Sequence, residues 1–226
     1  MHLKKIMSKI KLTQEMIMKT LDWTYDKVVT GIPGFDSAIE IAENYLSKTN
    51  DPKKCAKTLI RWQNTKAGTS GFLTGVGGII YMPLTVPANF ASVIYIQMRM
   101  VAAIAHMGGY DVKDDRVKTL IYACLAGNAA KDIVKDVGII IGNKMTLSLI
   151  KKIPGKTLTK INQKVGFRIL TKFGSTGAIN LGKAVPFVGG FVGGTFDILS
   201  TNTVGKIAKK TFLSGDNDNN SINEVA

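Results

Sequence analysis

Residues 67–98 read AGTSGFLTGVGGIIYMPLTVPANFASVIYIQM, and no charged side chain occurs between Lys66 and Arg99. Such a run is typical of a protein core or of lipid, because ionised groups are costly to remove from water and apolar groups gain free energy by leaving it. Pro83 and Pro87 divide the run, since a proline inside a helix removes a backbone donor and clashes with the preceding turn.

Neither half of this run has the character of a simple membrane span. Residues 71–82 are too few to cross ~30 Å of hydrocarbon as one helix, and residues 88–106 are nearly enough. The second segment carries polar groups that suit a helix buried in protein better than one facing lipid, namely Asn89, Gln97, Arg99 and His106. We expect Gln97 and Arg99 to form hydrogen bonds within the bundle. We therefore expect a core helix there, with full insertion of both uncharged segments as an alternative.

The length of 226 residues and a hydrophobic fraction of 45% are enough for one substantial core. Cys55 and Cys124 are 69 positions apart, which disfavours a disulfide framework and a zinc site, and we expect no metal and no cofactor. The apolar residues near the N-terminus are interrupted by lysines, so no signal peptide is expected. We predict a basic segment over 1–12, a helical domain over 13–213 and a disordered polar tail over 214–226.

Helix signals recur along the chain, and strand signals are few. Thr13 can cap a helix over 14–29, Ser37 and Glu40 have the spacing of a capping box, and Asp51-Pro52 is a further start signal. Further helices are expected at 88–106, 114–127 and 129–141, with weak β character at 137–141. The fold class predicted is all-α, a single bundle of seven to nine helices with glycine-rich apolar core helices.

Glycines four residues apart place small side chains on one helix face, where another backbone can approach closely. This spacing occurs twice in the apolar segments, at Gly71 with Gly75 and at Gly189, Gly190, Gly193 and Gly194. Two interpretations stay open, helix pairing in a membrane or self-association, and tight packing inside a bundle. We expect the pair of segments over 71–106 to pack against residues 185–199.

The cations are unevenly distributed in a chain of net charge +14. Between Val137 and Phe196 there is no acid, and five of the nine cations recur every fourth residue from Lys156 to Lys172. The neighbouring helix face is aliphatic, with Leu158, Ile161, Val165 and Ile169. This is the pattern of a basic amphipathic helix.

Two interpretations of this helix follow. It can lie on an anionic bilayer with its cations at the headgroups, or its aliphatic face can pack on the core while the cations are merely solvated. The lack of balancing acids favours the first. We predict that the segment faces anionic headgroups through Lys151, Lys152, Lys156, Lys160, Lys164, Arg168 and Lys172.

Several landmarks together resemble the EcsC family of bacterial proteins. They are patterns of glycine, small and apolar residues: Tyr25 with GIPGFDSA at 31–38, AENYL at 42–46, IQMR at 96–99, AHMGGYD at 105–111, KAVPFVGG at 183–190 and VGKIA at 204–208. The resemblance covers about Leu21 to Phe212. Asp197 departs from it, since a neutral residue such as asparagine is expected after the glycines.

The resemblance implies an α-helical, membrane-associated protein and supplies no catalytic residues. The family takes its name from an operon that encodes an ABC transporter, so a link to a transport system, with a membrane transporter or another protein as partner, is a further expectation. The function predicted is that of a cytoplasmic accessory or interaction protein, peripheral to the inner face of the membrane.

The alternative is a lipid-modifying or hydrolytic enzyme. His106 could act as a general base oriented by a nearby carboxylate, for which Asp111, Asp114 and Asp115 are candidates. The same acids are more simply interpreted as caps of a helix start. Sequence-specific nucleic-acid binding is not expected, because no helix-turn-helix or zinc-finger signature is present and few aromatic residues lie among the cations.

Overall fold

The computed structural model describes residues 13–67, 88–136, 138–139, 147–180 and 189–213. Within these ranges the chain forms α-helices, one 3-10 helix and a single isolated bridge between Ile32 and Phe35. The predicted all-α class is confirmed. Gly71, Gly75, Lys144, Lys183, the segment 1–12 and the tail 214–226 lie outside the described residues.

The first three helices begin at the predicted caps. α2 spans Gln14–Thr30, and the hydroxyl of Thr13 accepts a hydrogen bond from the amide of Met16. α3 spans Ala38–Leu46 behind a complete capping box, in which Ser37 Oγ accepts from the Glu40 amide at 3.2 Å and Glu40 Oε2 accepts from the Ser37 amide at 2.7 Å. α4 spans Pro52–Ala67. The chain turns between α2 and α3 at Gly31, whose φ of 85° favours glycine.

The remaining helices are α6 to α11, with one 3-10 helix between α7 and α8. α6 spans Ala88–Met107, and α7 spans Asp115–Leu125. The 3-10 helix Gly127–Ala129 leads into α8, Ala130–Lys135, which ends earlier than the predicted helix over 129–141. α9 is Leu147–Lys151, α10 is Gly155–Asn180 and α11 is Gly189–Phe212.

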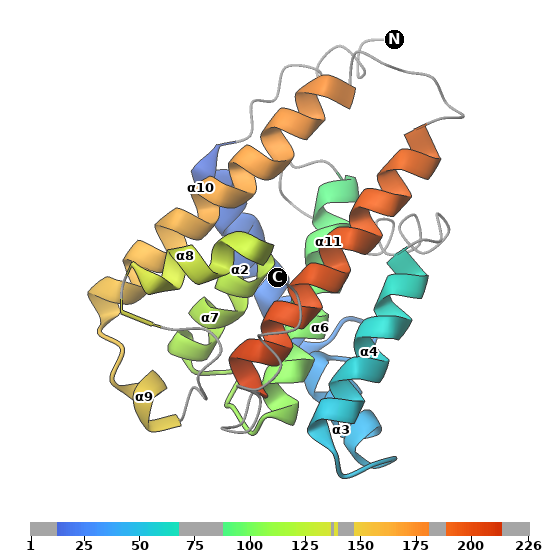
Figure 1. Ribbon diagram of the computed structural model, residues 1–226, viewed down its shortest axis with the longest axis vertical. Helices are drawn as coiled ribbons and strands as arrows, with labels where there is room; N and C mark the ends of the chain where they lie inside the picture. Colours follow the sequence, from blue (N-terminus) through green and yellow to red (C-terminus); the bar gives the residue numbers. More distant parts are fainter. Residues whose placement is uncertain (1–12, 68–87, 137, 140–146, 181–188, 214–226) are drawn as a thin grey trace, which may run out of the picture.

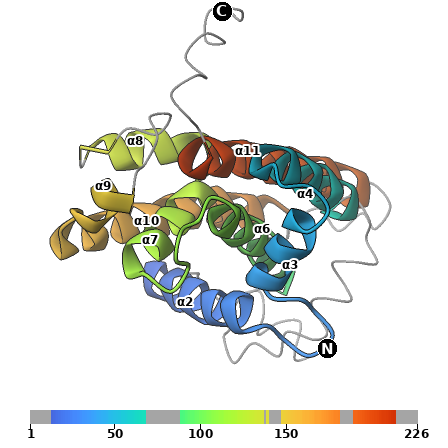
Figure 2. The same cartoon turned by 90° about the horizontal axis from the view of Figure 1, so that it is seen from below.

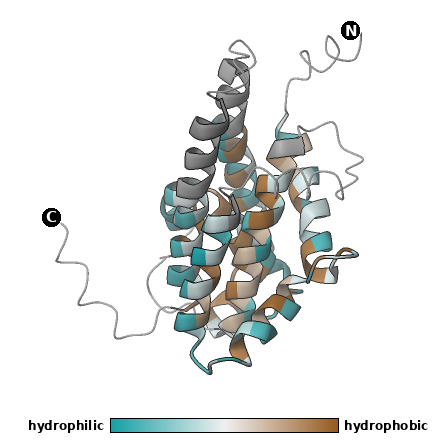
Figure 3. Cartoon of the chain, turned by 90° about the vertical axis from the view of Figure 1, so that its right-hand side faces the viewer, coloured by the Kyte–Doolittle hydropathy of each residue, from teal (hydrophilic) through white to brown (hydrophobic). Residues whose placement is uncertain are grey.

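α6 is the central helix of the bundle (Figures 1 and 2). It packs against α2, α3, α4, α7 and α11, while α10 packs against α2, α7 and α8 at one side of the molecule. The hydrophobic colour in Figure 3 gathers on the helices at the inside of the bundle. Of the expected packing of 71–106 against 185–199, the part between α6 and α11 is present, and residues 68–87 and 181–188 lie outside the described residues. Gln97 Nε2 donates to Ser200 Oγ at 3.3 Å and to Thr201 Oγ1 at 3.2 Å across the contact between α6 and α11.

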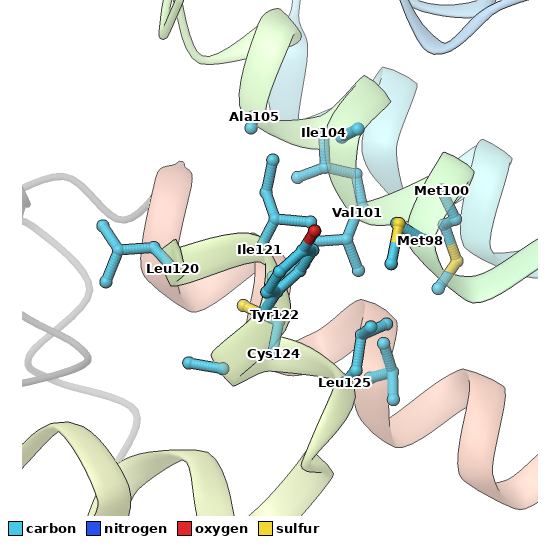
Figure 4. Close-up of a cluster of buried hydrophobic side chains, with 14 of the residues drawn as sticks. Met98, Met100, Val101, Ile104, Ala105, Leu120, Ile121, Tyr122, Cys124 and Leu125 are labelled. Atoms are coloured by element: carbon cyan, nitrogen blue, oxygen red, sulfur yellow. The ribbon is translucent and has the colours of Figure 1, made fainter. Parts of the chain in front are cut away.

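The core between α6 and α7 is made of aliphatic, methionine and aromatic side chains (Figure 4). Met98, Met100 and Ile104 are fully buried on α6, as are Ile121 and Tyr122 on α7. The hydroxyl of Tyr122 donates to Asp22 Oδ1 at 3.0 Å, which satisfies its polar end while the ring fills the core. The apolar sequence of α6 is therefore used for packing within the protein.

One segment in the described ranges, Phe90–Met107, has the length and composition of a membrane-spanning helix, with a mean hydropathy of 1.4 over 18 residues. In this structure 94% of that segment is buried inside the protein. A central core helix has the same composition, so the burial agrees with the expectation drawn from its polar residues.

Candidate functional site

The most cationic exposed surface lies along α9, the turn after it and α10. We call it the cationic face, and it consists of six exposed side chains: Lys151, Lys152, Lys156, Lys160, Lys164 and Arg168. Lys172, the seventh predicted contact residue, is different. It is only partly exposed, and its Nζ donates to Ser200 Oγ of α11 at 2.8 Å, so it ties α10 to the bundle.

The aliphatic side of α10 faces the protein interior. Ile161, Val165 and Ile169 are fully buried, and Leu158 packs on the same core. This matches the second alternative for that side of the helix, and the buried residues are not available to a bilayer. Two apolar side chains remain exposed beside the cations, Phe167 at 61% and Leu149 at 51%.

A shallow hollow of about 570 Å³ lies beside the cationic face. Phe167, Arg168 and Lys164 line it from α10, and Ile133 and Asp136 line it from α8. Lys164 forms an ion pair with Asp136, and both side chains are largely exposed, so the pair contributes little to stability. The surface thus combines an aromatic ring with cations, one of which has an acidic neighbour.

The structure does not bring together the predicted catalytic candidates. In the described part of the chain, no hydrogen bond or ion pair joins His106 to Asp111, Asp114 or Asp115, and the nearest acid to His106 is Glu43, with Oε1 3.9 Å from Nε2.

The three acids surround the start of α7 instead. Asp114 is its N-cap and accepts from the Arg116 amide at 2.7 Å, Asp115 lies in its first turn, and Asp111 accepts from the Lys113 amide at 2.8 Å. The interpretation of these acids as caps of a helix start is confirmed for Asp114, while Asp111 accepts a hydrogen bond in the turn before the helix.

The two cysteines have no environment that would activate a thiol. Both are free and buried. Burial raises the pKa of Cys124 to about 12, and burial also raises the pKa of Cys55. Nucleophilic cysteines require a lowered pKa, so both thiols behave as core groups. Among the described residues, no group of three potential metal ligands is present.

The predicted glycine stripe Gly189, Gly190, Gly193 and Gly194 lies in the first turns of α11, and its role in packing stays a prediction. A close approach of helices does occur further along α11, at Gly205. A Cβ added there would lie 2.7 Å from Cγ1 of Ile60 on α4. The need for a small residue at Gly205 comes from Ile60 on the facing helix α4, so the spacing of glycines along α11 does not predict it.

A second concave site lies where α3, α4 and α6 meet the turn after α2. This pocket has a volume of about 450 Å³ and is lined on its polar side by Lys48, Gln63 and Arg99, and on its apolar side by Phe35, Tyr45 and Trp62 among others. We call it the Arg99 pocket. The sequence-based prediction assigned Arg99 to hydrogen bonding within the bundle and did not anticipate a pocket.

Arg99 is 5% exposed, and its Nη1 donates a hydrogen bond to the backbone oxygen of Asp36 at 3.3 Å. Its guanidinium lies between two rings, 5.7 Å from the centroid of Phe35 and 5.3 Å from that of Tyr95. Burial lowers the pKa of Arg99 from its usual high value. The single cation within the apolar α6 sequence was the signal that could have pointed to this site.

Comparison with known proteins gives one match. A model of the EcsC protein family matches residues 2–213. The chain belongs to the EcsC protein family. No curated protein and no solved structure matches this chain.

The family match covers both the cationic face and the Arg99 pocket of this EcsC protein. The suspected family resemblance is thereby confirmed. The match adds no residue roles, so the function must be argued from the surfaces just described.

Proposed function

We propose that this EcsC-family protein is a peripheral interaction protein that binds an anionic lipid surface through the cationic face. The observation that carries the proposal is the exposure of six cations along α9, the turn after it and α10, on a segment whose other side is anchored in the core. Two of these cations, Lys164 and Arg168, line a hollow together with the exposed ring of Phe167. An anionic headgroup layer offers charge complementarity along the whole length of such a helix.

The packing of α10 supports an electrostatic mode of attachment. Because Ile161, Val165 and Ile169 are buried in protein, Phe167 and Leu149 are the large apolar side chains available for shallow insertion between headgroups among the described side chains of α9 and α10. Each Lys or Arg near an anionic surface contributes about 1 kcal/mol, and this contribution is screened at high salt. The expected binding is therefore reversible and weakens as ionic strength rises.

The other expected properties belong to the same proposal. The inner face of the cytoplasmic membrane is the anionic surface that we infer for this protein, and a transport protein embedded there is the partner class that the family resemblance suggests. The enzymatic alternative has less support, because His106 is not joined to Asp111, Asp114 or Asp115.

Co-sedimentation with vesicles tests the proposal. The full chain is mixed with vesicles of phosphatidylcholine alone or with added phosphatidylglycerol, at low and at moderate salt. We expect binding to the anionic vesicles that salt reverses, and little binding to neutral vesicles. Equal binding to both kinds of vesicle contradicts the proposal.

A charge-matched pair of variants locates the contact. The first replaces Lys156, Lys160, Lys164 and Arg168 by glutamine. The control replaces four exposed cations of α4 and α11, Lys54, Lys57, Arg61 and Lys210, by glutamine, and α4 lies across the molecule from α10 (Figure 1). At about 1 kcal/mol per cation, the first variant should bind roughly two to three orders of magnitude more weakly, and the control much less so. Equal losses would assign the binding to net charge alone.

Two further arms separate the alternatives. Removal of the bound protein by a carbonate wash is expected for peripheral attachment, and retention would indicate full insertion. A titration with duplex DNA of random sequence tests whether the same face binds phosphates of nucleic acid instead. Tighter binding to DNA than to anionic vesicles, lost in the α10 variant, would contradict the lipid proposal.

A further inference from the structure

The Arg99 pocket carries a second inference that is independent of the lipid-surface proposal. It lies between α3, α4 and α6, whereas the cationic face lies along α10, which does not border the pocket. Its residues come from four separate parts of the chain, and they include a guanidinium that is almost completely buried.

Two polar atoms of residues that line this pocket lack hydrogen-bond partners within the protein. Nε of Arg99 and Oε1 of Gln63 are buried and have no hydrogen-bond partner, and the whole Gln63 side chain is 2% exposed. A buried polar atom without a partner costs about 1 to 3 kcal/mol, and more if it carries charge. Both residues line the pocket, so a ligand that reaches these two atoms can supply the hydrogen-bond partner that the protein does not.

The charge of the pocket favours an anion. Among the described residues, no carboxylate forms an ion pair with Arg99, and Asp36 contacts it through a backbone oxygen. Lys48 adds a second cation at the wall, 5.7 Å above the ring of Tyr45. A desolvated cation gains most from an oxyanion, and the planar guanidinium can bind both oxygens of a carboxylate.

The remaining wall is apolar and aromatic. Trp62 is 52% exposed at the pocket, and Phe35, Ile41, Tyr45 and Leu59 complete this side. A volume of about 450 Å³ lies within the range of pockets that hold small organic molecules, which are lined mostly by apolar side chains with a few polar groups.

We infer that the Arg99 pocket binds a small organic carboxylate with an apolar body. The carboxylate lies against Arg99 and Gln63, and the hydrocarbon or aryl part lies against Trp62 and Tyr45. The Gln63 amide can turn by half a rotation to offer its N–H₂ group to the ligand. A carboxylate fits better than a phosphate dianion, because Arg99 and Lys48 also have Asp36 beside them and leave one anionic charge to be neutralised.

Trp62 provides the readout. The chain has two tryptophans, so a Trp23→Phe background leaves Trp62 as the only one. Its fluorescence is followed while 3-phenylpropionate, the uncharged 3-phenylpropanol or phenyl phosphate is added to the full-length protein at neutral pH. We expect a saturable change with the carboxylate, with the alcohol at least about tenfold weaker. No saturable change up to about 10 mM carboxylate, or tighter binding of phenyl phosphate, overturns the proposal.

Variants test the assignment of residues. Arg99→Gln should weaken binding of the carboxylate by about tenfold or more, while Arg61→Gln, an exposed arginine of α4 outside the pocket, should change it less than about twofold. Binding of the alcohol should be the same in Arg99→Gln as in the parent. If a folded Arg99→Gln variant lost the same affinity for the carboxylate and for the alcohol, Arg99 would only hold the turn at Asp36 in place, and it would not bind the carboxylate.

A second variant keeps the test decisive if Arg99→Gln does not fold. Asn44 is exposed on α3 and lines the pocket, so Asn44→Phe fills the space without entering the core. We expect an unchanged unfolding midpoint and loss of carboxylate binding, and unchanged binding would overturn the proposal. The α10 glutamine variant should bind the carboxylate normally, which separates this result from the outcome of the vesicle experiments.

Discussion

α6 and α10 are both long helices that contain an arginine, but they hold their cations in opposite environments. On α6, Arg99 is 5% exposed and lies between two aromatic rings. On α10, Arg168 and its neighbouring lysines are exposed to solvent. The difference follows from how many sides of each helix are covered. Five helices pack around α6, whereas α10 packs mainly against α2, α7 and α8, and its cationic side stays exposed.

The comparison shows that a cation in a helix has no fixed role. Solvated cations on α10 cost little to maintain and can act together on an extended anionic surface. A desolvated cation such as Arg99 is costly without a partner, which is a reason to expect a specific ligand beside it. The following experiments test whether the interior of α6 and the outer side of α10 differ as strongly as this contrast requires.

The largest effect is expected from a new charge. Ala102 of α6 is fully buried, and Ala102→Glu places a carboxylate among apolar side chains, which should lower the free energy of unfolding by more than about 4 kcal/mol. Gln163 of α10 is exposed, and Gln163→Glu should change the free energy of unfolding by less than about 0.5 kcal/mol. Urea unfolding followed by circular dichroism measures both values. Similar losses in the two variants would contradict the contrast between the helices.

Truncation of side chains should separate the two sides of α10. Ile104→Ala on α6 and Ile161→Ala on α10 each remove a fully buried side chain and should cost about 2 to 5 kcal/mol. Phe167→Ala removes a larger group, but at 61% exposure it should cost less than about 1 kcal/mol. Phe167→Ala should instead weaken binding to anionic vesicles. A large loss of stability with unchanged vesicle binding would assign Phe167 to the core.

Two glycines give a matched test of interior and surface. Gly205→Ala on α11 would place a Cβ 2.7 Å from Ile60, and we expect a loss of about 1 to 3 kcal/mol in thermal unfolding. Gly155 begins α10 and has nothing within 4 Å of an added Cβ. Gly155→Ala should therefore be neutral or slightly stabilising, because alanine restricts the unfolded chain. A tolerated Gly205→Ala would mean that α4 and α11 can move apart at no cost.

The smallest effect is expected from a single surface cation. Lys164→Gln breaks the exposed ion pair with Asp136 and should change the free energy of unfolding by less than about 0.5 kcal/mol. The same change should measurably reduce affinity for anionic vesicles at low salt. A loss above 1 kcal/mol, determined by the same urea titration, would show that this lysine has a structural role.

Local signals in the sequence predicted the helices well where a cap is formed by neighbouring residues. Thr13, Ser37 with Glu40, and Asp114 all act as caps, because each bond joins residues two or three positions apart. The end of α8 was less accurate. α8 ends at Lys135, whereas a helix was predicted to run to 141. Residues 138–139, the described part of the segment 137–141 with β character, form no strand. Short aliphatic segments give similar patterns in helices and strands, so the sequence could not decide this end.

The candidate sites were predicted in part. The sequence located the cations of the basic stretch and the aliphatic face beside them, but it left open whether that face meets lipid or protein. It assigned Arg99 a bonding role inside the bundle and could not find the pocket. Phe35, Tyr45, Trp62 and Arg99 lie on separate segments and meet only after folding. The close helix contact at Gly205 was likewise determined by Ile60 on another helix.

The sequence by itself determined the helical class, the capped starts of α2, α3, α4 and α7, the central position of an apolar helix and the concentration of cations in one stretch. These properties depend on local hydrogen bonds and on the transfer of side chains from water, which are set by residue type and spacing. The tertiary structure decided which side of α10 is exposed, why Lys172 differs from the other cations, and which groups surround Arg99. These depend on the placement of residues far apart in the chain, which spacing along one helix does not specify.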